Sequence, residues 1–295
     1  DGDTITVSDV TTTSGNVQDY HAADAVSLTG TLEGDTINLT GDSFNYAGND
    51  TLADEDGGDP PLTFTVTENA DATTVDAGTV APNEATFAGT FPNTESGAMN
   101  YGITADAGEL ELLSGDASQF AGSNLTLTAN GGGLYVRDPL TGADSLASAD
   151  FNASTSMEVA PVATTNTQTY NPGAGGVLEL DGAYTTTNSD WTANGDLELQ
   201  AALTVNTDAG GGDIDINGIV ENSGPANHAV TLNAGGGNIN VGGAVGGGGS
   251  PMDSVDSVDF DGNNVTIAAV TSNNTQDYNA NGVLTLNGPL QGPTI

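Results

Sequence analysis

Short runs of alternating apolar and polar residues recur along this chain, separated by turns of glycine and asparagine. In the run DIDING, residues 213–218, the isoleucines fall on one face of an extended strand and the polar residues on the other, and Asn217-Gly218 supplies a turn. The same alternation predicts strands at 4–7, 177–180, 196–200, 238–241, 265–268 and 283–286. Threonine, valine, isoleucine, asparagine, aspartate and glycine dominate, which is typical of strands and turns. The pattern therefore predicts an all-β chain.

A longer motif occurs three times. The segment TQTYNPGAGGVLELDG at 167–182 is nearly repeated as TQDYNANGVLTLNG at 275–288, and VQDYHAADAVSLTG at 17–30 is a looser copy. Each copy holds a Gln-x-Tyr element, formed by Gln18 and Tyr20, Gln168 and Tyr170, and Gln276 and Tyr278. A repeated coil cannot bury its own apolar face and must stack on its neighbours, so the same residues return in each coil. We interpret the Gln-x-Tyr element as a structural corner with a buried amide and ring.

The tyrosines of this motif set the repeat length. The interval from Tyr20 to Tyr170 is clearly longer than the interval from Tyr170 to Tyr278. The longer interval predicts an insertion within about 44–121, including an acidic stretch at 48–61 that we expect to form a loop and not a strand. We expect one continuous repeat solenoid over 1–295, with phases of about 1–20 (partial), 21–170, 171–278 and 279–295 (partial). The pattern begins and stops in mid-repeat, which predicts a segment of a longer series.

The spacing of the strand runs indicates how the chain coils. Successive runs end at Leu180, Leu199, Ile216 and Leu232, so that one end follows another at short and similar intervals. This spacing suits one coil of ~20 residues in a β-solenoid, in which each coil stacks on the last at ~4.8 Å. Tandem Ig-like β-sandwich domains are the alternative, because such a domain is about as long as the repeat. The motifs that recur inside each repeat, and the single tryptophan, favour the solenoid.

Charge narrows the functional classes. The chain has 40 acidic residues against one basic residue, Arg137, which gives a formal net charge of −39. Nucleic-acid binding and attraction to anionic lipid both need lysine and arginine, so the composition excludes them. Such a chain repels itself unless salt or divalent cations screen it, which indicates a saline, halophilic or calcium-containing setting. The absence of cysteine excludes disulfides and thiolate metal sites, and no apolar run reaches transmembrane length.

Three stretches together carry a family resemblance. They read GGGDIDINGIV, then AVTLNAGGGNINVGGAVGG, then VTIAAVTSNNTQDYNANGVLTLNG. This succession resembles the repeats of large bacterial surface adhesins of the filamentous-haemagglutinin type, over 166–290 most closely, recognisably over 124–170 and 1–39, and weakly over 44–121. The resemblance implies a right-handed parallel β-helix, secretion to the cell surface, and a role in cell adhesion or extracellular structure.

Two stretches resemble calcium loops. AGNDTLADEDGGD, residues 47–59, is similar to half of a nonapeptide calcium roll, and Ca²⁺ is the candidate cofactor. Its candidate ligands are Asp50, Asp54, Asp56 and Asp59. The run DIDING begins like an EF-hand loop, but the twelfth position is Gly224 where a bidentate glutamate is required. We therefore interpret DIDING as a solvent-facing strand edge.

The chain offers little for catalysis. His21 and His228 have no histidine at the equivalent positions of the other repeats. Solenoid enzymes that act on acidic polysaccharides need basic residues to hold the substrate carboxylates and stabilise developing charge, and a single arginine does not supply them. We expect no catalytic residues and no enzyme activity.

These observations predict a non-enzymatic, secreted structural or adhesive protein, a stiff acidic rod or filament at the cell surface or in the extracellular matrix. Its expected partners are other copies stacked end to end or a continuation of the same chain, with a glycan or surface ligand as a further candidate, and no membrane insertion. The alternatives are a carbohydrate- or calcium-binding surface module of a giant adhesin and, less favoured, a polysaccharide-degrading β-helix enzyme.

Overall fold

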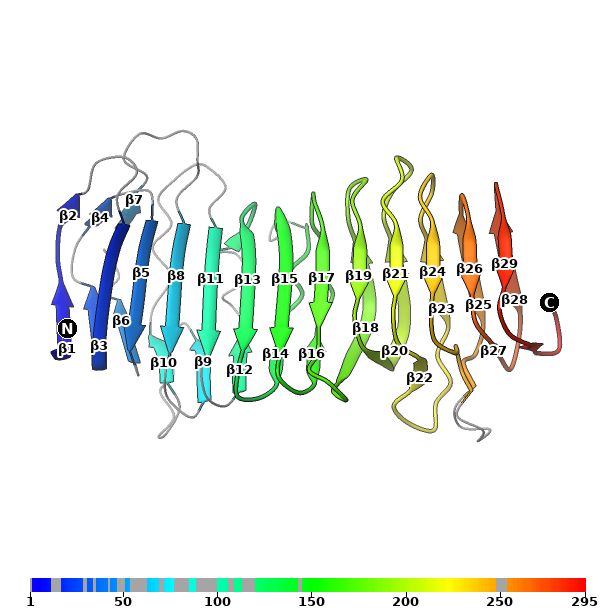
Figure 1. The fold of residues 1–295 in the computed structure, drawn as a ribbon, viewed down its shortest axis with the longest axis horizontal. Helices are drawn as coiled ribbons and strands as arrows, with labels where there is room; N and C mark the ends of the chain where they lie inside the picture. Colours follow the sequence, from blue (N-terminus) through cyan, green and yellow to red (C-terminus); the bar gives the residue numbers. More distant parts are fainter. Residues whose placement is uncertain are drawn as a thin grey trace. The chain divides into compact units, whose positions relative to one another are not determined.

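The computed structural model describes the backbone of residues 2–11, 17–28, 31–33, 36–41, 43–46, 51–53, 63–68, 72–76, 85–88, 100–105, 109–112, 120–142, 145–247 and 254–295. These residues form thirty β-strands and no α-helix, and the strands pair in parallel (Figure 1). The prediction of a parallel β-helix is confirmed. Ig-like sandwiches are excluded, because their sheets are antiparallel.

The chain divides into two compact units. Unit 1 holds residues 1–147 and 151–154, and unit 2 holds 148–150 and 155–295. Each unit is a stack of coils whose strands pair with the equivalent strands of the coils before and after. The continuity of one solenoid across both units stays a prediction.

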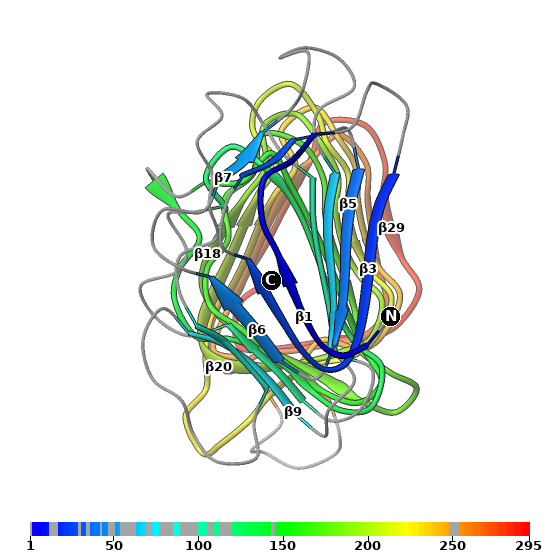
Figure 2. The ribbon, with the colours of Figure 1, turned by 90° about the vertical axis from the view of Figure 1, so that its left-hand side faces the viewer.

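The described residues of unit 1 form fourteen strands. They are β1 (Gly2–Val7), β2 (Val10–Thr11), β3 (Val17–Leu28), β4 (Thr31–Glu33), β5 (Thr36–Gly41), β6 (Ser43–Tyr46), β7 (Thr51–Ala53), β8 (Thr63–Glu68), β9 (Ala72–Asp76), β10 (Ala85–Ala88), β11 (Asn100–Ala105), β12 (Glu109–Leu112), β13 (Asn124–Ala129) and β14 (Leu134–Val136). One face carries the ladder β3–β5–β8–β11–β13, and β6 and β9 lie on another face (Figure 2).

The region 44–121 adds coils to unit 1. Strand β8 pairs in register with β5 on one side and β11 on the other, and β12 pairs with β9 and β14. The expectation of a loop without a strand at 48–61 is wrong at β7, whose Leu52 pairs with Leu32 of β4. Residues 54–62 lie outside the described part of the chain. The sequence around β7 gives only a weak strand signal, but β4 offers a strand edge with which it pairs. Pairing between coils therefore decides the structure of this segment.

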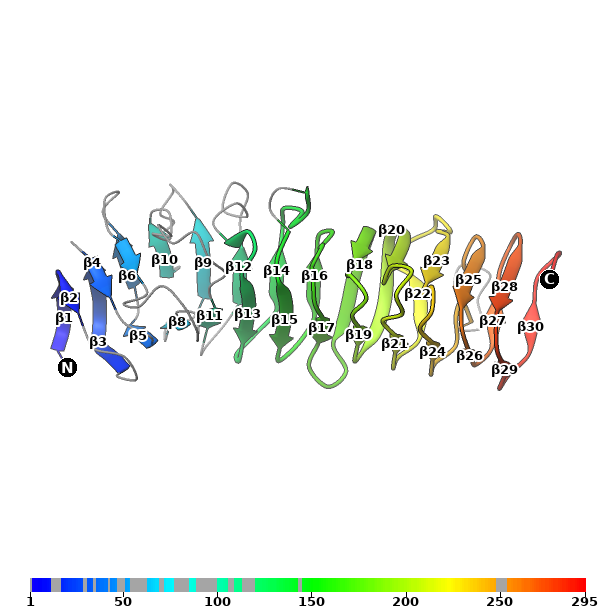
Figure 3. The ribbon, with the colours of Figure 1, turned by 90° about the horizontal axis from the view of Figure 1, so that it is seen from above.

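Unit 2 is built from the remaining strands, with β15 shared between the units. They are β15 (Ser148–Ala153), β16 (Met157–Val159), β17 (Gln168–Asn171), β18 (Val177–Thr185), β19 (Trp191–Ala193), β20 (Asp196–Asn206), β21 (Ile214–Ile216), β22 (Val220–Asn222), β23 (Val230–Asn233), β24 (Ile239–Val241), β25 (Val258–Gly262), β26 (Val265–Ile267), β27 (Val270–Thr271), β28 (Gln276–Ala280), β29 (Leu284–Leu286) and β30 (Leu290–Gln291). Strands β16 and β18 follow one another along one row, and β17, β19 and β21 along another (Figure 3).

The coils of unit 2 vary in length. Val258 pairs with Val230 of the coil before and with Gln276 of the coil after, and the first of these two steps along the chain is much the longer. The expectation that strand runs follow one another at similar intervals therefore does not hold for every coil. Two of the runs used for that estimate, ending at Leu199 and Ile216, lie on β20 and β21, which belong to different faces. Turns of unequal length separate the faces, and apolar periodicity does not report turn length.

Inward-facing aliphatic residues form continuous columns in unit 2. One column runs Trp191, Ile214, Ile239, Val265 and Leu284, each in register with the next. The first four are at most 1% exposed, because their strands alternate inward and outward side chains and a coil covers them on each side. This alternation confirms the strand interpretation of the run DIDING.

Candidate functional site: glutamine–tyrosine corners and polar columns

The structure brings together all three predicted glutamine–tyrosine pairs. In each pair the two residues are two positions apart on a strand, so both side chains point to the same inward face. The tyrosine hydroxyl donates a hydrogen bond to the glutamine Oε1 at 3.1 Å for Tyr20 and Gln18, 2.8 Å for Tyr170 and Gln168, and 3.0 Å for Tyr278 and Gln276. The three glutamines are at most 4% exposed. The same local geometry thus recurs in β3, β17 and β28.

The amide of Gln168 joins two coils. Its Nε2 donates to the carbonyl oxygen of Val162 at 3.1 Å, at the corner just before β17. It also donates to the carbonyl oxygen of Thr185 at 2.7 Å, in the following coil. A buried amide without such partners costs free energy, so the pairing with Tyr170 and these two carbonyls satisfies a group that would otherwise destabilise the fold.

The last copy of the element repeats this arrangement. The Nε2 of Gln276 donates to the hydroxyl of Ser272 at 3.1 Å and to the carbonyl oxygen of Gln291, in β30, at 2.6 Å. In unit 1 the Nε2 of Gln18 donates to the carbonyl oxygen of Val10 at 3.3 Å. In all three copies the glutamine Nε2 donates to a backbone carbonyl oxygen at a corner. The interpretation of the element as a structural corner stays a prediction.

Aromatic rings pack behind the central corner. Tyr170, Tyr184 and Trp191 are fully buried, with ring centroids 5.5 to 6.3 Å apart. The hydroxyl of Tyr184 donates to the carbonyl oxygen of Val159. Burial raises the pKa of Tyr170 and of Tyr184 above the usual range, because the phenolate would lose its hydration. These hydroxyls therefore remain protonated donors at neutral pH.

A column of asparagines follows one corner of unit 2. The Nδ2 of Asn194 donates to the Oδ1 of Asn171 at 2.6 Å, and the Nδ2 of Asn217 donates to the Oδ1 of Asn194 at 2.8 Å. Both steps span 23 residues. Sequence reasoning missed this column. The signal that could have found it is the recurrence of asparagine at that interval just before a turn residue, Pro172 or a glycine.

A second polar column includes the start of the run DIDING. The Oδ1 of Asp190 accepts the backbone N–H of Asp213 at 2.9 Å, and the Oδ1 of Asp213 accepts the backbone N–H of Asn238 at 2.7 Å. The Nδ2 of Asn264 continues the column to Asn238 at 2.7 Å. Residues 214–216 form β21, so the carboxylates alternate along a strand and do not converge as an EF-hand loop requires.

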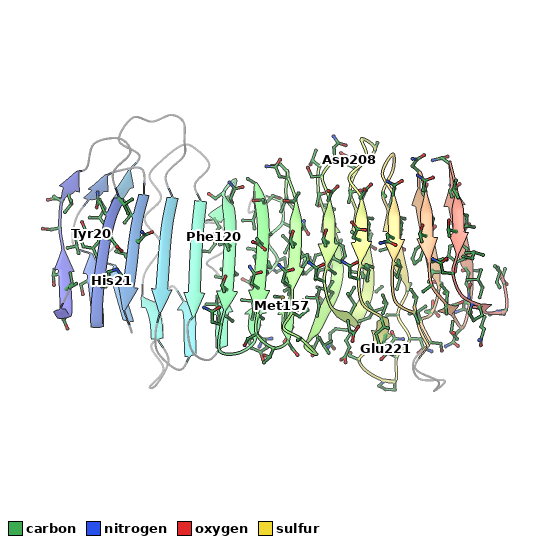
Figure 4. All side chains as sticks on the ribbon, viewed as in Figure 1. Tyr20, His21, Phe120, Met157, Asp208 and Glu221 are labelled. Atoms are coloured by element: carbon green, nitrogen blue, oxygen red, sulfur yellow. The ribbon has the colours of Figure 1, made fainter. Side chains whose placement is uncertain are left out.

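Four glutamates stand in register on another face of unit 2. Glu158 pairs with Glu179, Glu179 with Glu198, and Glu198 with Glu221, which projects from β22 (Figure 4). Neighbouring strands are ~4.8 Å apart, so these carboxylates repel one another. Partial burial, and then the charges of Glu179 and Glu221, raise the pKa of Glu198.

The remaining candidates are placed apart from these columns. The calcium candidates Asp50, Asp54, Asp56 and Asp59 lie outside the described residues. Among the residues that the structure describes, no group of three or more His, Cys, Asp or Glu side chains could hold a metal ion. The described chain also holds no helix long and apolar enough to cross a membrane.

The two histidines and the arginine lie at separate places. The Nε2 of His21 is 3.0 Å from the Oδ1 of Asp19, and both side chains are about half exposed. The backbone N–H of His228 donates a hydrogen bond to the Oδ1 of Asn222 at 2.9 Å. The guanidinium of Arg137 lies 4.6 Å from the ring centre of Tyr135, in unit 1. Among the described contacts, none joins the two histidines to each other, and none joins a histidine to Arg137.

Comparison with known proteins gives no relative: no family model, no curated protein and no solved structure matches this chain. The resemblance to adhesin repeats of the filamentous-haemagglutinin type stays a prediction.

Proposed function

We propose that this chain is a non-enzymatic structural or adhesive element that serves outside the cell, at the cell surface or in the extracellular matrix, as a stiff acidic spacer. One observation carries the proposal: the polar residues that the sequence repeats most faithfully hydrogen-bond coil to coil. The amide of Gln168 reaches Thr185 of the next coil, and that of Gln276 reaches Gln291. Their side chains are occupied by the fold itself, as expected of residues repeated for stiffness and not for ligand recognition.

The strand ladders support a mechanical role. Each inner coil of unit 2 shares backbone hydrogen bonds with the coil before and the coil after, and side-chain columns reinforce the same contacts. Bending such a stack would break several in-register contacts together, so the stack resists bending.

The charge supports an extracellular setting. A net charge of −39 keeps chains apart at low salt, whereas high salt or divalent cations allow them to approach. Outward columns such as the four glutamates place this charge along the coils. Such a surface keeps a secreted spacer soluble and lets cations bring neighbouring spacers together.

The test separates a spacer from an enzyme. Beads carrying the chain at one end are incubated with neutral and acidic polysaccharides, and both bead retention on immobilised polysaccharide and released reducing ends are measured. We expect no release of reducing ends, and retention that depends on salt. Release of reducing ends that disappears on replacement of a single aspartate or glutamate would overturn the proposal in favour of a polysaccharide-degrading enzyme.

A further inference from the structure

Each asparagine of the column in unit 2 is followed by a turn residue with its own chemistry. The pairs are Asn171-Pro172, Asn194-Gly195 and Asn217-Gly218. A backbone nitrogen that follows an asparagine can attack the Cγ of that asparagine, and glycine hinders this attack least because it has no Cβ. Proline has no backbone N–H, so the first pair cannot react in this way. The column therefore contains two pairs that can cyclise.

The fold requires glycine in both of these pairs. A Cβ on Gly195 would collide with the ring of Pro172, and a Cβ on Gly218 would collide with the carbonyl oxygen of Gly195. Neither glycine donates its N–H to an acceptor among the described residues, so both nitrogens are available as nucleophiles. The close stacking of the coils thus keeps a chemically labile pair at two successive corners.

Hydrogen bonds hold the two asparagines differently. The Nδ2 of Asn194 donates to the Oδ1 of Asn171, and the Oδ1 of Asn194 accepts from the Nδ2 of Asn217. The Oδ1 of Asn217 has no such donor, because the equivalent position of the next coil is Gly242, which has no side-chain amide. Asn194 and Asn217 are both exposed, so hydrogen bonding distinguishes them and solvent access does not.

We propose that Asn217-Gly218 is a site of spontaneous covalent modification, at which the asparagine converts to aspartate or isoaspartate. The Cγ of Asn217 must turn toward the nitrogen of Gly218, and this movement breaks one hydrogen bond of the column. The same movement at Asn194 breaks two. Asn194 therefore reacts more slowly, although it too is exposed and followed by glycine.

The reaction needs only water. The nitrogen of Gly218 forms a bond to the Cγ of Asn217, the bond between Cγ and Nδ2 breaks, and ammonia leaves with the proton that the glycine nitrogen loses. The two groups are adjacent in the chain, so the attack is intramolecular and gives a cyclic imide. Water then adds to one of the two imide carbonyls and opens the ring, which leaves aspartate or isoaspartate at position 217.

The product alters the corner at which it forms. A carboxylate at position 217 no longer donates to the Oδ1 of Asn194, and it adds one negative charge beside that oxygen. Isoaspartate also adds an atom to the backbone where Gly218 packs on Gly195. The modification goes beyond the proposed structural function, because it accumulates with the age of the chain and weakens the contact between two particular coils.

The test compares the two pairs within one chain. The full chain is kept folded in mildly alkaline buffer and sampled over time, and cleavage after Glu179, Glu198 and Glu221 then puts the two pairs in different peptides. Tandem mass spectrometry measures the fraction of each asparagine that has become an acid. We expect Asn217 to convert about two to ten times faster than Asn194, the factor that one additional hydrogen bond supplies. In guanidinium chloride the two rates should agree.

Two variants at Gly242 test the cause of the difference. A Cβ there meets no atom closer than 3.6 Å, so the position accepts a side chain. Gly242→Asn extends the column and offers a donor to the Oδ1 of Asn217, so the conversion of Asn217 should slow to the rate of Asn194. Gly242→Ala adds a Cβ but no amide, and should leave the rate of Asn217 unchanged.

Three results would overturn the proposal. The first is a rate at Asn194 that equals or exceeds the rate at Asn217 in the folded wild type. The second is a difference between the two rates that persists in guanidinium chloride, because the fold is then not its source. The third is the same rate at Asn217 in Gly242→Asn and Gly242→Ala.

Discussion

Asn217 donates a hydrogen bond from its side-chain Nδ2 to the Oδ1 of Asn194, 23 residues earlier, at 2.8 Å. The Nδ2 of Asn194 in turn donates a hydrogen bond to the Oδ1 of Asn171. The amide of Asn194 therefore both donates and accepts, so the two hydrogen bonds polarise one another along the column. Identical residues one coil apart thus act as one structural element.

Replacement of Asn194 by alanine removes two of these hydrogen bonds. We expect the free energy of unfolding to fall by about 1–2 kcal/mol, because a typical hydrogen bond contributes ~0.5–1.5 kcal/mol. The measurement is a guanidinium chloride titration followed by circular dichroism. The control is Asn281→Ala, an exposed asparagine outside the column, which should change the value by less than about 0.5 kcal/mol. Equal losses in the two variants would contradict a stabilising column.

The corner glutamine makes a stronger prediction. Gln168→Leu leaves the carbonyls of Val162 and Thr185 and the hydroxyl of Tyr170 without this buried partner. Both carbonyls keep a backbone donor, Thr185 N–H for Val162 and Thr164 N–H for Thr185, so the loss is that of three buried hydrogen bonds. At ~0.5–1.5 kcal/mol each, we expect a loss of about 2–4 kcal/mol in the same titration. Gln291→Ala is the matched control: its carbonyl accepts from Gln276 and its side chain is exposed, so it should be nearly neutral.

A glycine between coils predicts a steric effect. A Cβ on Gly218 would lie 2.2 Å from the carbonyl oxygen of Gly195, in the preceding coil, so Gly218→Ala forces the two coils apart. We expect a loss of about 1–3 kcal/mol in the free energy of unfolding. Gly224→Ala is the control, because a Cβ there meets nothing within 4 Å. A neutral Gly218→Ala would show that the coils are less closely stacked than the structure describes.

Lowering the pH should raise the free energy of unfolding of unit 2. Burial and neighbouring carboxylates raise the pKa values of Glu198, Asp215 and Asp259. A raised pKa in the folded state means that the folded chain binds protons more tightly than the unfolded chain. This stabilisation is fully present below the unfolded pKa near 4 and is lost as pH rises through the folded pKa. We therefore expect the guanidinium chloride midpoint of unit 2 to rise as pH falls from about 7 to about 4.

A single substitution tests the source of that pH dependence. Glu198→Gln removes the central charge of the glutamate column, and should stabilise the chain at pH 7 by a few tenths to about 1 kcal/mol while flattening the pH profile. Asp181→Asn removes an exposed carboxylate of β18 outside the column and should leave the profile as it is. If both variants give the wild-type profile, the column is not its source.

Sequence alone predicts the elements whose signal is local. The alternation at 4–7 and 213–218 places β1 and β21 correctly, because inward aliphatic residues are required in any coil. The joining of each glutamine to its tyrosine follows from their i, i+2 spacing on a strand. These features need no knowledge of which coils are neighbours.

Other features depend on which residues meet one coil apart. The asparagine column requires the register between β17, β19 and β21, which turns of variable length conceal. Strand β7 exists because Leu32 offers it a partner edge, although glycine and acidic residues surround it in the sequence. Contacts of this kind become visible only when the pairing is known.

The stacking of like on like has a consequence for how such chains change through inheritance. Each inner coil of unit 2 pairs with its two neighbouring coils, and Asn194 meets an asparagine in the coil before and in the coil after. Duplication or deletion of the stretch that separates Asn171 from Asn194 would bring asparagines back into contact and keep the asparagine column continuous. Recombination between repeats could therefore lengthen or shorten the stack of coils by whole coils. The added or remaining coils would pack through the same contacts as before.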